Sequence, residues 1–300
     1  MSKFLTAGII QKETIVKVNK LPIKYSPVIN ALETIFSDIG GDAFNMMAAL
    51  EWLGDEVDFF SMVGKDDSYL IEKENLNPQL ILPKLIETPA AVVLYDESRK
   101  QQMFEDIKDL RYVSYEIELF QERLATTDMV ILSNANFCRP FVKLTKEAKI
   151  PLAVNFHDYH PKKMKYNIDF YEAADIIYLS DSTIKGEPYE FVHQLALDFP
   201  AKCIILGMGK QGLLMYTRED NLVVPYDSVH IKHIKNTVGA GNALFSCFLH
   251  YYMKKGDFHE AIKYALLFAA YKIGYVGTSK GFMTESEMSQ WYDLIWNSYH

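Results

Sequence analysis

The sequence predicts an α/β fold of three layers, with a central, mostly parallel sheet and a small, separate β-sheet. From Asp128 onwards, short apolar segments alternate with segments of helical periodicity. This alternation is typical of a parallel sheet that helices cover on both faces. Residues 80–105 break the alternation, because three short strand-like segments follow one another there. These segments predict the small sheet.

The composition excludes several classes of protein. The chain has 300 residues, of which 49% are hydrophobic and 23% charged, as in ordinary globular proteins. A net charge of −8, without a basic tract, argues against nucleic-acid binding. No apolar run approaches the roughly 18 residues of a membrane span, and residues 1–10 do not have the form of a signal peptide.

Cysteine and histidine usage predicts a reduced, cytoplasmic protein without a metal cluster. The three cysteines are widely spaced and form no C-x-x-C pair: Cys138, Cys203 and Cys247. Three histidines lie in or beside polar segments without zinc-site spacing: His157, His160 and His193.

The N-terminal part of the chain predicts three strands and a helix. The strands are Lys3–Ile10, Thr14–Val18 and Val57–Met62. Glu13 lies in the turn between the first two strands, where a lone Glu usually faces the solvent. Gly40 and Gly41 lead into a helix that ends at Gly54, and Asp42 could serve as its N-cap.

Three further short strands predict the small sheet, together with Thr14–Val18. They are Leu80–Glu87, Ala91–Tyr95 and Gln102–Glu105, separated by residues 88–89 and by the polar turn 96–100. We expect these strands to form one sheet outside the main domain.

The rest of the chain predicts the large sheet and its helices. The expected strands are Met129–Leu132, Leu152–Asn155, Ile176–Leu179 and Ile204–Leu206. The expected helices are Phe141–Lys149, Glu187–Asp198, Ala243–Lys254, Phe258–Val276 and Glu285–Trp296. Ligands of such sheets bind beyond the carboxyl ends of the strands.

The most informative stretch is the glycine-rich loop before the helix that begins at Ala243. Gly239, Ala240 and Gly241 follow one another, so the loop presents bare N–H groups at the positive end of a helix dipole. Such a loop suits a phosphate or the charge of a phosphoryl-transfer transition state. Taken alone, it is equally compatible with tight packing.

Residues 236–244 resemble the C-terminal motif of the ribokinase-like (PfkB) carbohydrate kinases, usually written D-T-x-G-A-G-D-x-F. The resemblance covers nearly the whole chain and implies a ribokinase-like domain over residues 1–300. It implies a β lid over the sugar, formed by about residues 12–24 and 80–106 and often shared between two subunits of a homodimer. It also implies ATP and Mg²⁺ as cofactors and a sugar or sugar-like ligand.

The resemblance also implies roles for individual residues. In the family the second Asp of the motif takes the proton from the sugar hydroxyl, and Asn242 stands at its position. Gly239, Ala240 and Gly241 correspond to the anion hole. The residues implied for sugar binding are Glu13, Gly40, Gly41 and Asn45. Side-chain amides suit sugars because they both donate and accept hydrogen bonds.

The segments that the resemblance implies for nucleotide binding retain the glycines of the family motifs. Gly209 and Gly212 match the family's T-L-G-x-x-G turn, with Gly207 in place of the Thr. The glycine-containing turn 277–281 resembles the one that closes the adenine pocket.

In other positions of the site, uncharged residues replace the acidic residues of the family. Ser180 and Thr183 stand where the family usually has N-x-x-E, and Asn236 and Asn155 stand where it has Asp. The residues implied for nucleotide binding are therefore Gly209, Gly212, Ser180 and Asn236. Because Mg²⁺ prefers carboxylate and phosphate oxygens, we expect weakened Mg²⁺ binding and no metal site formed by the protein alone.

Two functions fit these observations. One is an ATP-dependent carbohydrate kinase that is slow or uses an unusual base, since an amide cannot accept a proton as Asn242 would have to. The other is a non-catalytic relative that binds a sugar or nucleotide and acts as a sensor or partner protein. A dinucleotide oxidoreductase is excluded, because residues 8–13 carry no G-x-G-x-x-G after the first strand.

Overall fold

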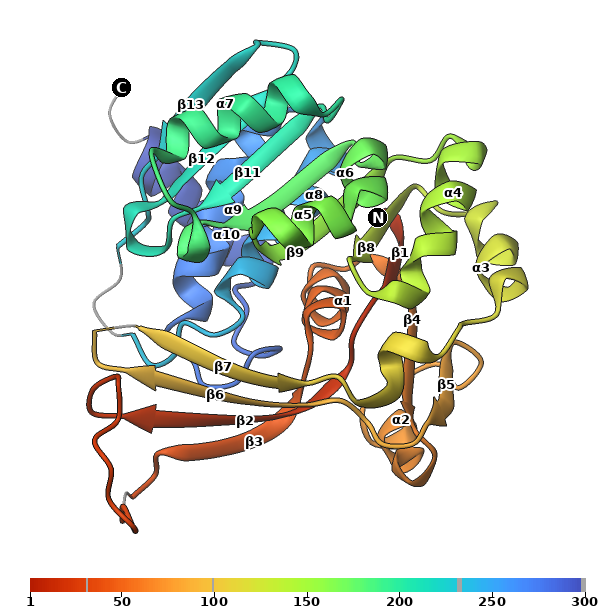
Figure 1. The fold of residues 1–300 in the computed structure, drawn as a ribbon. Coiled ribbons are helices and arrows are strands. Elements are labelled where there is room, and N and C mark those ends of the chain that lie inside the picture. Colours follow the sequence, from red (N-terminus) through yellow and green to blue (C-terminus); the bar gives the residue numbers. More distant parts are fainter. Residues whose placement is uncertain (31, 99, 231–233, 298–300) are drawn as a thin grey trace.

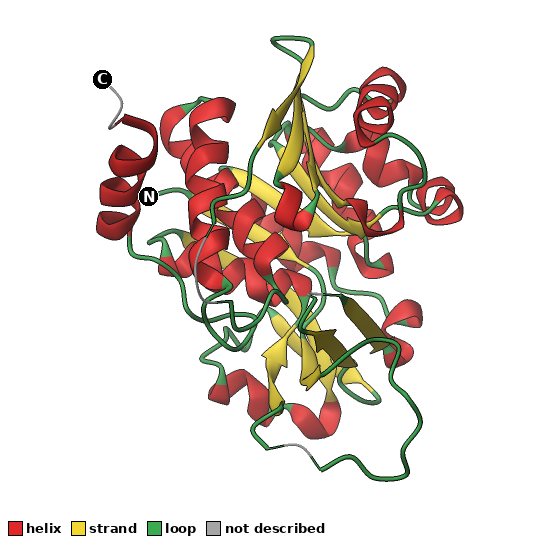
Figure 2. Ribbon diagram, turned by 90° about the vertical axis from the view of Figure 1, so that its left-hand side faces the viewer, coloured by secondary structure: helices red, strands yellow, loops and turns green. Residues whose placement is uncertain are grey.

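Within the described residues, a nine-stranded sheet forms the centre of the protein, and helices cover both of its faces (Figures 1 and 2). The structure is a computed structural model that describes all residues except 31, 99, 231–233 and 298–300. The strand order is β13-β12-β11-β10-β9-β8-β1-β4-β5. The strands are β1 (Lys3–Ala7), β4 (Glu56–Gly64), β5 (Ile81–Leu85), β8 (Met129–Ser133), β9 (Leu152–Asp158), β10 (Ile176–Ser180), β11 (Cys203–Gly207), β12 (Leu213–Thr217) and β13 (Leu222–Tyr226).

The strands from β11 to β5 are parallel, whereas β12 and β13 add an antiparallel hairpin at one edge. Successive residues of a parallel strand enter opposite hydrophobic cores. Met129 and Ile131 pack on one side of the sheet, and Val130 and Leu132 pack on the other. Burial of both faces explains why these strands are apolar throughout. The predicted α/β class is confirmed.

Two helical layers enclose the sheet. One core contains side chains of α1 (Asp42–Trp52), α8 (Ala240–Lys255), α9 (Phe258–Lys272) and α10 (Glu285–Tyr292). The other contains side chains of α3 (Ile117–Leu124), α4 (Arg139–Ala148), α6 (Ile168–Ala173) and α7 (Pro188–Asp198). Two shorter helices lie in connections: α2 (Tyr69–Lys73) and α5 (Pro161–Tyr166). None of the described helices is both long and apolar enough to cross a membrane.

Helix boundaries follow local signals. Asp257 caps α9 by accepting from the N–H groups of His259 and Glu260. Thr284 and Glu287 form a capping box at the start of α10. Gly256 ends α8 in the left-handed conformation.

A four-stranded sheet lies beside the large one, in the order β3-β2-β6-β7. Its strands are β2 (Gln11–Val18), β3 (Ile35–Gly40), β6 (Ala90–Asp96) and β7 (Gln101–Asp106). Three of them were expected from the sequence. The prediction missed β3, whose apolar residues are interrupted by Ser37 and Asp38, and which forms by pairing with β2.

The prediction that Leu80–Glu87 joins the small sheet is wrong. Residues Ile81–Leu85 form β5, which pairs in parallel with β4 at the edge of the large sheet. Ile81 and Leu85 are fully buried in the two cores of the large sheet, so the hydrophobic effect holds β5 there.

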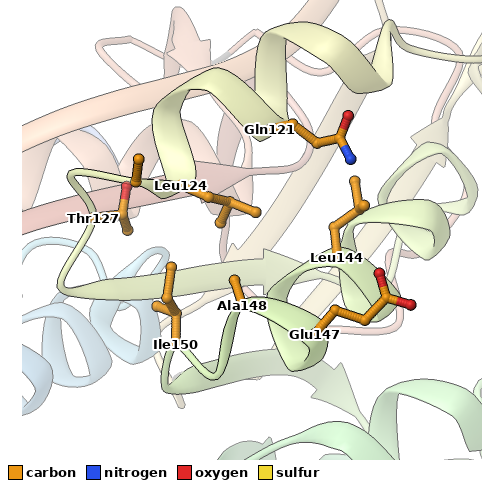
Figure 3. Close-up of a pocket in the computed structure, with 8 residues that line it drawn as sticks. Gln121, Leu124, Thr127, Leu144, Glu147, Ala148 and Ile150 are labelled. Carbon is orange, nitrogen blue, oxygen red and sulfur yellow. The ribbon is translucent and has the colours of Figure 1, made fainter.

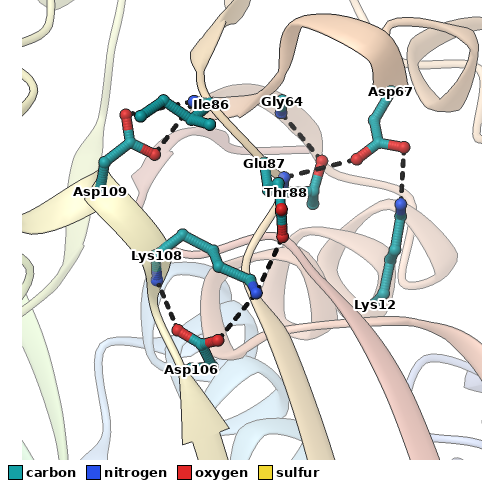
Figure 4. A network of polar contacts seen from close by, with 9 residues as sticks. All are labelled: Lys12, Gly64, Asp67, Ile86, Glu87, Thr88, Asp106, Lys108 and Asp109. Carbon is teal, nitrogen blue, oxygen red and sulfur yellow. Dashed lines mark hydrogen bonds and ion pairs between the residues drawn. The ribbon is translucent and has the colours of Figure 1, made fainter.

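A network of polar contacts joins the two sheets (Figure 4). Lys12 of β2 contacts Asp67 at 2.6 Å, and Asp67 accepts from the N–H of Thr88 at 3.4 Å. The Thr88 hydroxyl in turn accepts from the N–H of Gly64 at 2.9 Å. Lys108 binds Asp106 at the end of β7 at 2.8 Å. The small sheet is therefore tied to the end of β4.

Gly41 allows α1 to begin directly against the loop that follows β1. Its backbone has φ 105° and ψ 147°, a region that side chains do not tolerate. A Cβ at this position would lie 2.3 Å from the carbonyl oxygen of Ile9. The close approach of these two segments therefore requires glycine.

We expect Gly41→Ala to lower the free energy of unfolding by about 3 kcal/mol or more, the sum of backbone strain and overpacking. Gly54→Ala is a matched control, because Gly54 has φ 89° but open space around its Cβ position. It should cost only about 1–2 kcal/mol of strain. Equal losses in urea unfolding would show that close packing at Gly41 contributes nothing.

Candidate active site

A cavity of about 340 Å³ lies between the carboxyl ends of the large-sheet strands and the small sheet. It gathers five residues predicted from the sequence: Glu13, Gly41, Asn45, Gly239 and Asn242. The remaining lining residues include Gln11, Asp42, Met103, Glu105, Arg111, Ser133, Asn136, Phe156, His157, Lys163, Tyr166, Asn167 and Val238. The lining combines apolar side chains with several polar ones, which is typical of small-molecule sites.

A second hollow, of about 510 Å³, lies between α3 and α4 (Figure 3). It is lined by Gln121, Leu124, Ala125, Thr127, Leu144, Glu147, Ala148 and Ile150. None of the predicted site residues contributes to it.

Asn242 is held in the first turn of α8 by a buried amide pair. The backbone N–H of His157 donates to Asn155 Oδ1 at 3.0 Å, and Asn155 Nδ2 donates to Asn242 Oδ1 at 2.9 Å. Because a backbone N–H can only donate, it fixes the orientation of the Asn155 amide, which in turn fixes that of Asn242. The amide nitrogen of Asn242 is left as its hydrogen-bond donor at the cavity wall.

Glu13 is a buried residue of β2, with 4% of its surface exposed, and the turn predicted for it is wrong. Gln11 Nε2 donates to its carboxylate at 3.3 Å. Burial raises the pKa of the Glu13 carboxyl, while neighbouring hydrogen-bond donors and the charge of Lys272 oppose that shift. Gly40 packs directly against the Glu13 carboxylate, because a Cβ on Gly40 would lie 2.6 Å from Glu13 Oε2.

The beginning of α1 contains two polar residues of the site, Asp42 and Asn45. The N-cap of α1 is Gly41, and Asp42 is the first helical residue, so Asp42 as N-cap is wrong. Its carboxylate accepts from the N–H groups of Ile9 and Ala43. Asn45 is buried on the cavity wall, and among the described residues its Oδ1 has no hydrogen-bond partner. This oxygen is an unsatisfied acceptor in the wall of the cavity.

The loop before α8 presents part of the expected anion site. The N–H of Ala240 is bound to the carbonyl of Thr237 at 3.3 Å, so it is not free as the sequence suggested. Within the described part of the chain, no protein acceptor binds the N–H groups of Gly239 or Gly241. Gly239 has φ 79°, and a Cβ there would lie 2.8 Å from the carbonyl oxygen of Thr278.

Lys272 was not predicted from the sequence, although it is a cation that follows the apolar segment at the end of α9. Its side chain is fully buried, and Nζ donates to the carbonyls of Val238 at 2.6 Å and Gly277 at 2.5 Å. Since the C=O and N–H of a trans peptide point in opposite directions, binding the Val238 carbonyl turns the N–H of Gly239 away from Lys272. Burial lowers the pKa of Lys272 to about 8, and the Glu13 carboxylate opposes this shift.

Comparison with known proteins identifies the family. Residues 8–285 match the pfkB family carbohydrate kinases. The chain belongs to this family. Among curated relatives, it is 36% identical to the deoxyribokinase of Salmonella typhi over 91 residues, which are 30% of this chain and 29% of the relative. It is 23% identical to the ATP-dependent ribose-1-phosphate kinase of Halopiger xanaduensis over 280 residues, covering 88% of this chain and 90% of the relative.

Solved structures show the same fold. The microbiome-derived acarbose kinase Mak1 has a TM-score of 0.82 at 19% identity, covering 97% of this chain and 98% of that protein. The ribokinase of Arabidopsis thaliana has a TM-score of 0.77 at 16% identity, covering 97% and 99%. The ribokinase-like architecture is therefore confirmed.

The predicted nucleotide residues of this pfkB family member lie outside the cavity. Gly209 and Gly212 flank the turn after β11, both with positive φ, and a Cβ on Gly212 would lie 1.9 Å from the carbonyl oxygen of Tyr226. Asn236 is buried, and its Oδ1 accepts from the N–H of Val238 at 2.9 Å, which shapes the loop before α8. Ser180 ends β10.

The turn after β10 does not fit a magnesium site. It carries a single carboxylate, Asp181, and burial raises the pKa of that group. The Thr183 hydroxyl donates to the carbonyl of Tyr159. Among the residues that the structure describes, no group of three or more His, Cys, Asp or Glu side chains could hold a metal ion.

The lowered pKa of Lys272 predicts a pH dependence of stability. Its pKa of about 8 in the folded state lies below the value of about 10.4 in the unfolded chain, so the unfolded state binds more protons between these values. Relative to a Lys272→Met variant, the free energy of unfolding of the wild type should therefore rise by about 2 kcal/mol between about pH 7.5 and 9.5.

Urea unfolding of both proteins across this range measures the effect. The comparison cancels groups common to both proteins, while Glu13 and His157, which share the electrostatic environment, stay in place. Parallel stability curves would contradict the prediction.

Proposed function

We propose that this protein binds a sugar or sugar-like ligand in the cavity and a nucleotide beside the start of α8, without efficient phosphoryl transfer. The observation that carries the proposal is the orientation of Asn242, whose oxygen is bound by Asn155. Binding is supported by the family and by related structures: the Arabidopsis ribokinase was solved with ribose and ATP, and the Cryptococcus neoformans ribokinase with ADP.

Phosphoryl transfer to a hydroxyl requires a group that takes up its proton. The amide of Asn242 cannot do so, and its nitrogen donates where a carboxylate would accept. General-base catalysis typically contributes about 10²–10⁴-fold, or about 3–5 kcal/mol of the barrier. A hydroxyl in this cavity would therefore be bound as an acceptor at Asn242 and keep its proton.

A slow kinase is the second candidate, because much of the machinery is in place. The N–H groups of Gly239 and Gly241 and the nearby charge of Lys272 suit an anionic phosphate. Phosphoryl transfer relies strongly on such positioning and charge stabilisation. Against this candidate, the turn at residues 180–183 carries only one acid, Asp181, with which to organise Mg²⁺.

Substituting Asn242 separates the two candidates. In a protein that lacks only the base, Asn242→Asp should raise turnover by about 10²-fold or more, since the change is nearly isosteric. We expect a rise of less than about tenfold, because the acids near Ser180 are still missing. The measurement is coupled ADP release across a panel of sugars and nucleosides, with nucleotide binding followed by calorimetry.

Asn45→Ala in the Asn242→Asp background is the control, because it should remove any sugar-dependent signal if Asn45 binds the ligand. Robust phosphorylation of a sugar by the unmodified protein would overturn the proposal. If the wild type binds no nucleotide or sugar in calorimetry, the proposal that the protein binds these ligands is overturned.

We also propose that the small sheet acts as a lid shared by two subunits, in a cytoplasmic protein. Its outer face exposes apolar side chains: Val92, 40% exposed, pairs with Phe104, 55% exposed, and Ile35, 63% exposed, pairs with Val16 on the same sheet. Exposed apolar patches of this kind are typical of protein–protein interfaces. The free cysteines Cys138, Cys203 and Cys247 are all buried, which agrees with a reducing compartment.

Phe104→Glu should convert a dimer into a monomer in light scattering after size-exclusion chromatography, because it places a charge within the apolar patch. Leu197→Glu is the control, since Leu197 is 68% exposed on α7, which belongs to the large domain. A wild type that is monomeric at all concentrations would contradict the shared lid.

A further inference from the structure

Tyr178 places a phenol hydroxyl between two loops that flank the expected phosphate position. A Cβ on Gly207, at the end of β11, would lie 2.8 Å from Tyr178 Oη. A Cβ on Gly241, in the first turn of α8, would lie 2.6 Å from the same oxygen. The two glycines leave a slot that the hydroxyl fills, although Gly207 stands where the family has a threonine.

The ring of Tyr178 is held rigidly beside the amide pair. Tyr178 of β10 is the register partner of Asn155 of β9, so both side chains lie on the α8 face of the sheet. The ring stacks on Phe245 of α8, with centroids 5.3 Å apart and planes inclined by 26°. Only 6% of the residue is exposed. The hydroxyl is thereby fixed near the N-terminus of α8.

Within the described residues, no hydrogen bond is made by the Tyr178 hydroxyl, even though the residue is more than nine-tenths buried. Its oxygen is not one of the fully enclosed, unpaired polar atoms of the described residues, so it retains some surface from which it can donate to a ligand. Burial raises the pKa of this phenol well above its usual range, and the Asp181 carboxylate raises it further. The hydroxyl therefore stays protonated and can donate to an anion.

We propose that the Tyr178 hydroxyl donates a hydrogen bond to a phosphate group of the bound nucleotide, and so positions that group between Gly207 and the start of α8. The inference rests on the proposed nucleotide binding. It adds a side-chain donor to the backbone N–H groups of Gly239 and Gly241. Hydrogen bonds to charged phosphate oxygens are among the stronger ones in proteins.

Tyr178→Phe removes the donor and keeps the ring. We expect the Kd for ADP to rise about tenfold, which corresponds to about 1.4 kcal/mol, whereas the Kd for adenosine should change by less than about twofold. Isothermal titration calorimetry with ADP, adenosine and inorganic phosphate measures both effects. Weakened binding of ADP and inorganic phosphate assigns the contact to a phosphate group.

Tyr251→Phe is a matched control. Tyr251 is also a buried tyrosine whose hydroxyl has no hydrogen-bond partner among the described residues, and it lies ten residues further along α8. At 1.5 Å per residue, it is about 15 Å from Gly241. Its loss should leave the affinity for ADP unchanged.

The outcomes separate this inference from the function on which it rests. Equal affinities of wild type and Tyr178→Phe for ADP would overturn the inference alone, and so would equal losses for ADP and adenosine. Absence of ADP binding by the wild type would overturn both the inference and the proposed nucleotide binding.

A double-mutant cycle tests the geometry without any ligand. Gly207→Ala should lower the melting temperature of the wild type by about 5 °C, because its Cβ would overlap the Tyr178 hydroxyl. The same substitution in the Tyr178→Phe background should cost less than about half as much. Equal losses in the two backgrounds would show that the hydroxyl does not occupy the slot.

Discussion

Burial of both faces of the central sheet is the constraint on which the rest of the molecule depends. Strands β8, β9 and β10 lie between two helical layers, so their inner positions are apolar and polar side chains occur towards their ends. Ser133, Asn155 and Ser180 occupy such positions. Since the strands are parallel, these ends share one edge of the sheet, and the cavity lies at that edge.

The amide pair of Asn155 and Asn242 changes the chemistry of that edge without disturbing its packing. Two carboxylates at the same separation would repel each other, and one of them would have to bind a proton. Two amides satisfy each other while remaining neutral, and the N–H of His157 fixes their direction. The two asparagines are best understood as one unit, because the orientation of Asn242 depends on that of Asn155.

The positive charge of Lys272 lies against the loop before α8, and Lys272 does not line the cavity. Lys272 binds two backbone carbonyls and is enclosed by protein, so its ammonium group is poorly screened by water. It also directs the Val238–Gly239 peptide, with the N–H facing away from the lysine. The direction of the Gly239 N–H is therefore fixed by a residue more than thirty positions later in the chain.

The sequence by itself determined the α/β class, the strands β8 to β11 and the glycine-rich loop before α8. Those features depend on local periodicity and on the conformations available to glycine, which neighbouring residues encode. It also placed Glu13, Asn45 and Asn242 near one another, through the resemblance to a family of known motif order. The existence of a strand at β5 was visible, but the predicted segment, Leu80–Glu87, is longer than the observed Ile81–Leu85, and its choice of sheet was not predicted.

Only the tertiary structure decided where β3 and β5 pair, because strand pairing is a contact between segments far apart in sequence. It likewise decided the direction of the Asn242 amide, the burial of Lys272 beneath the loop and the position of the Tyr178 hydroxyl between two glycines. Each of these depends on which side chains the packed sheet brings together. The physical reason is that hydrogen-bond direction and burial are properties of an environment, and residue type alone does not specify that environment.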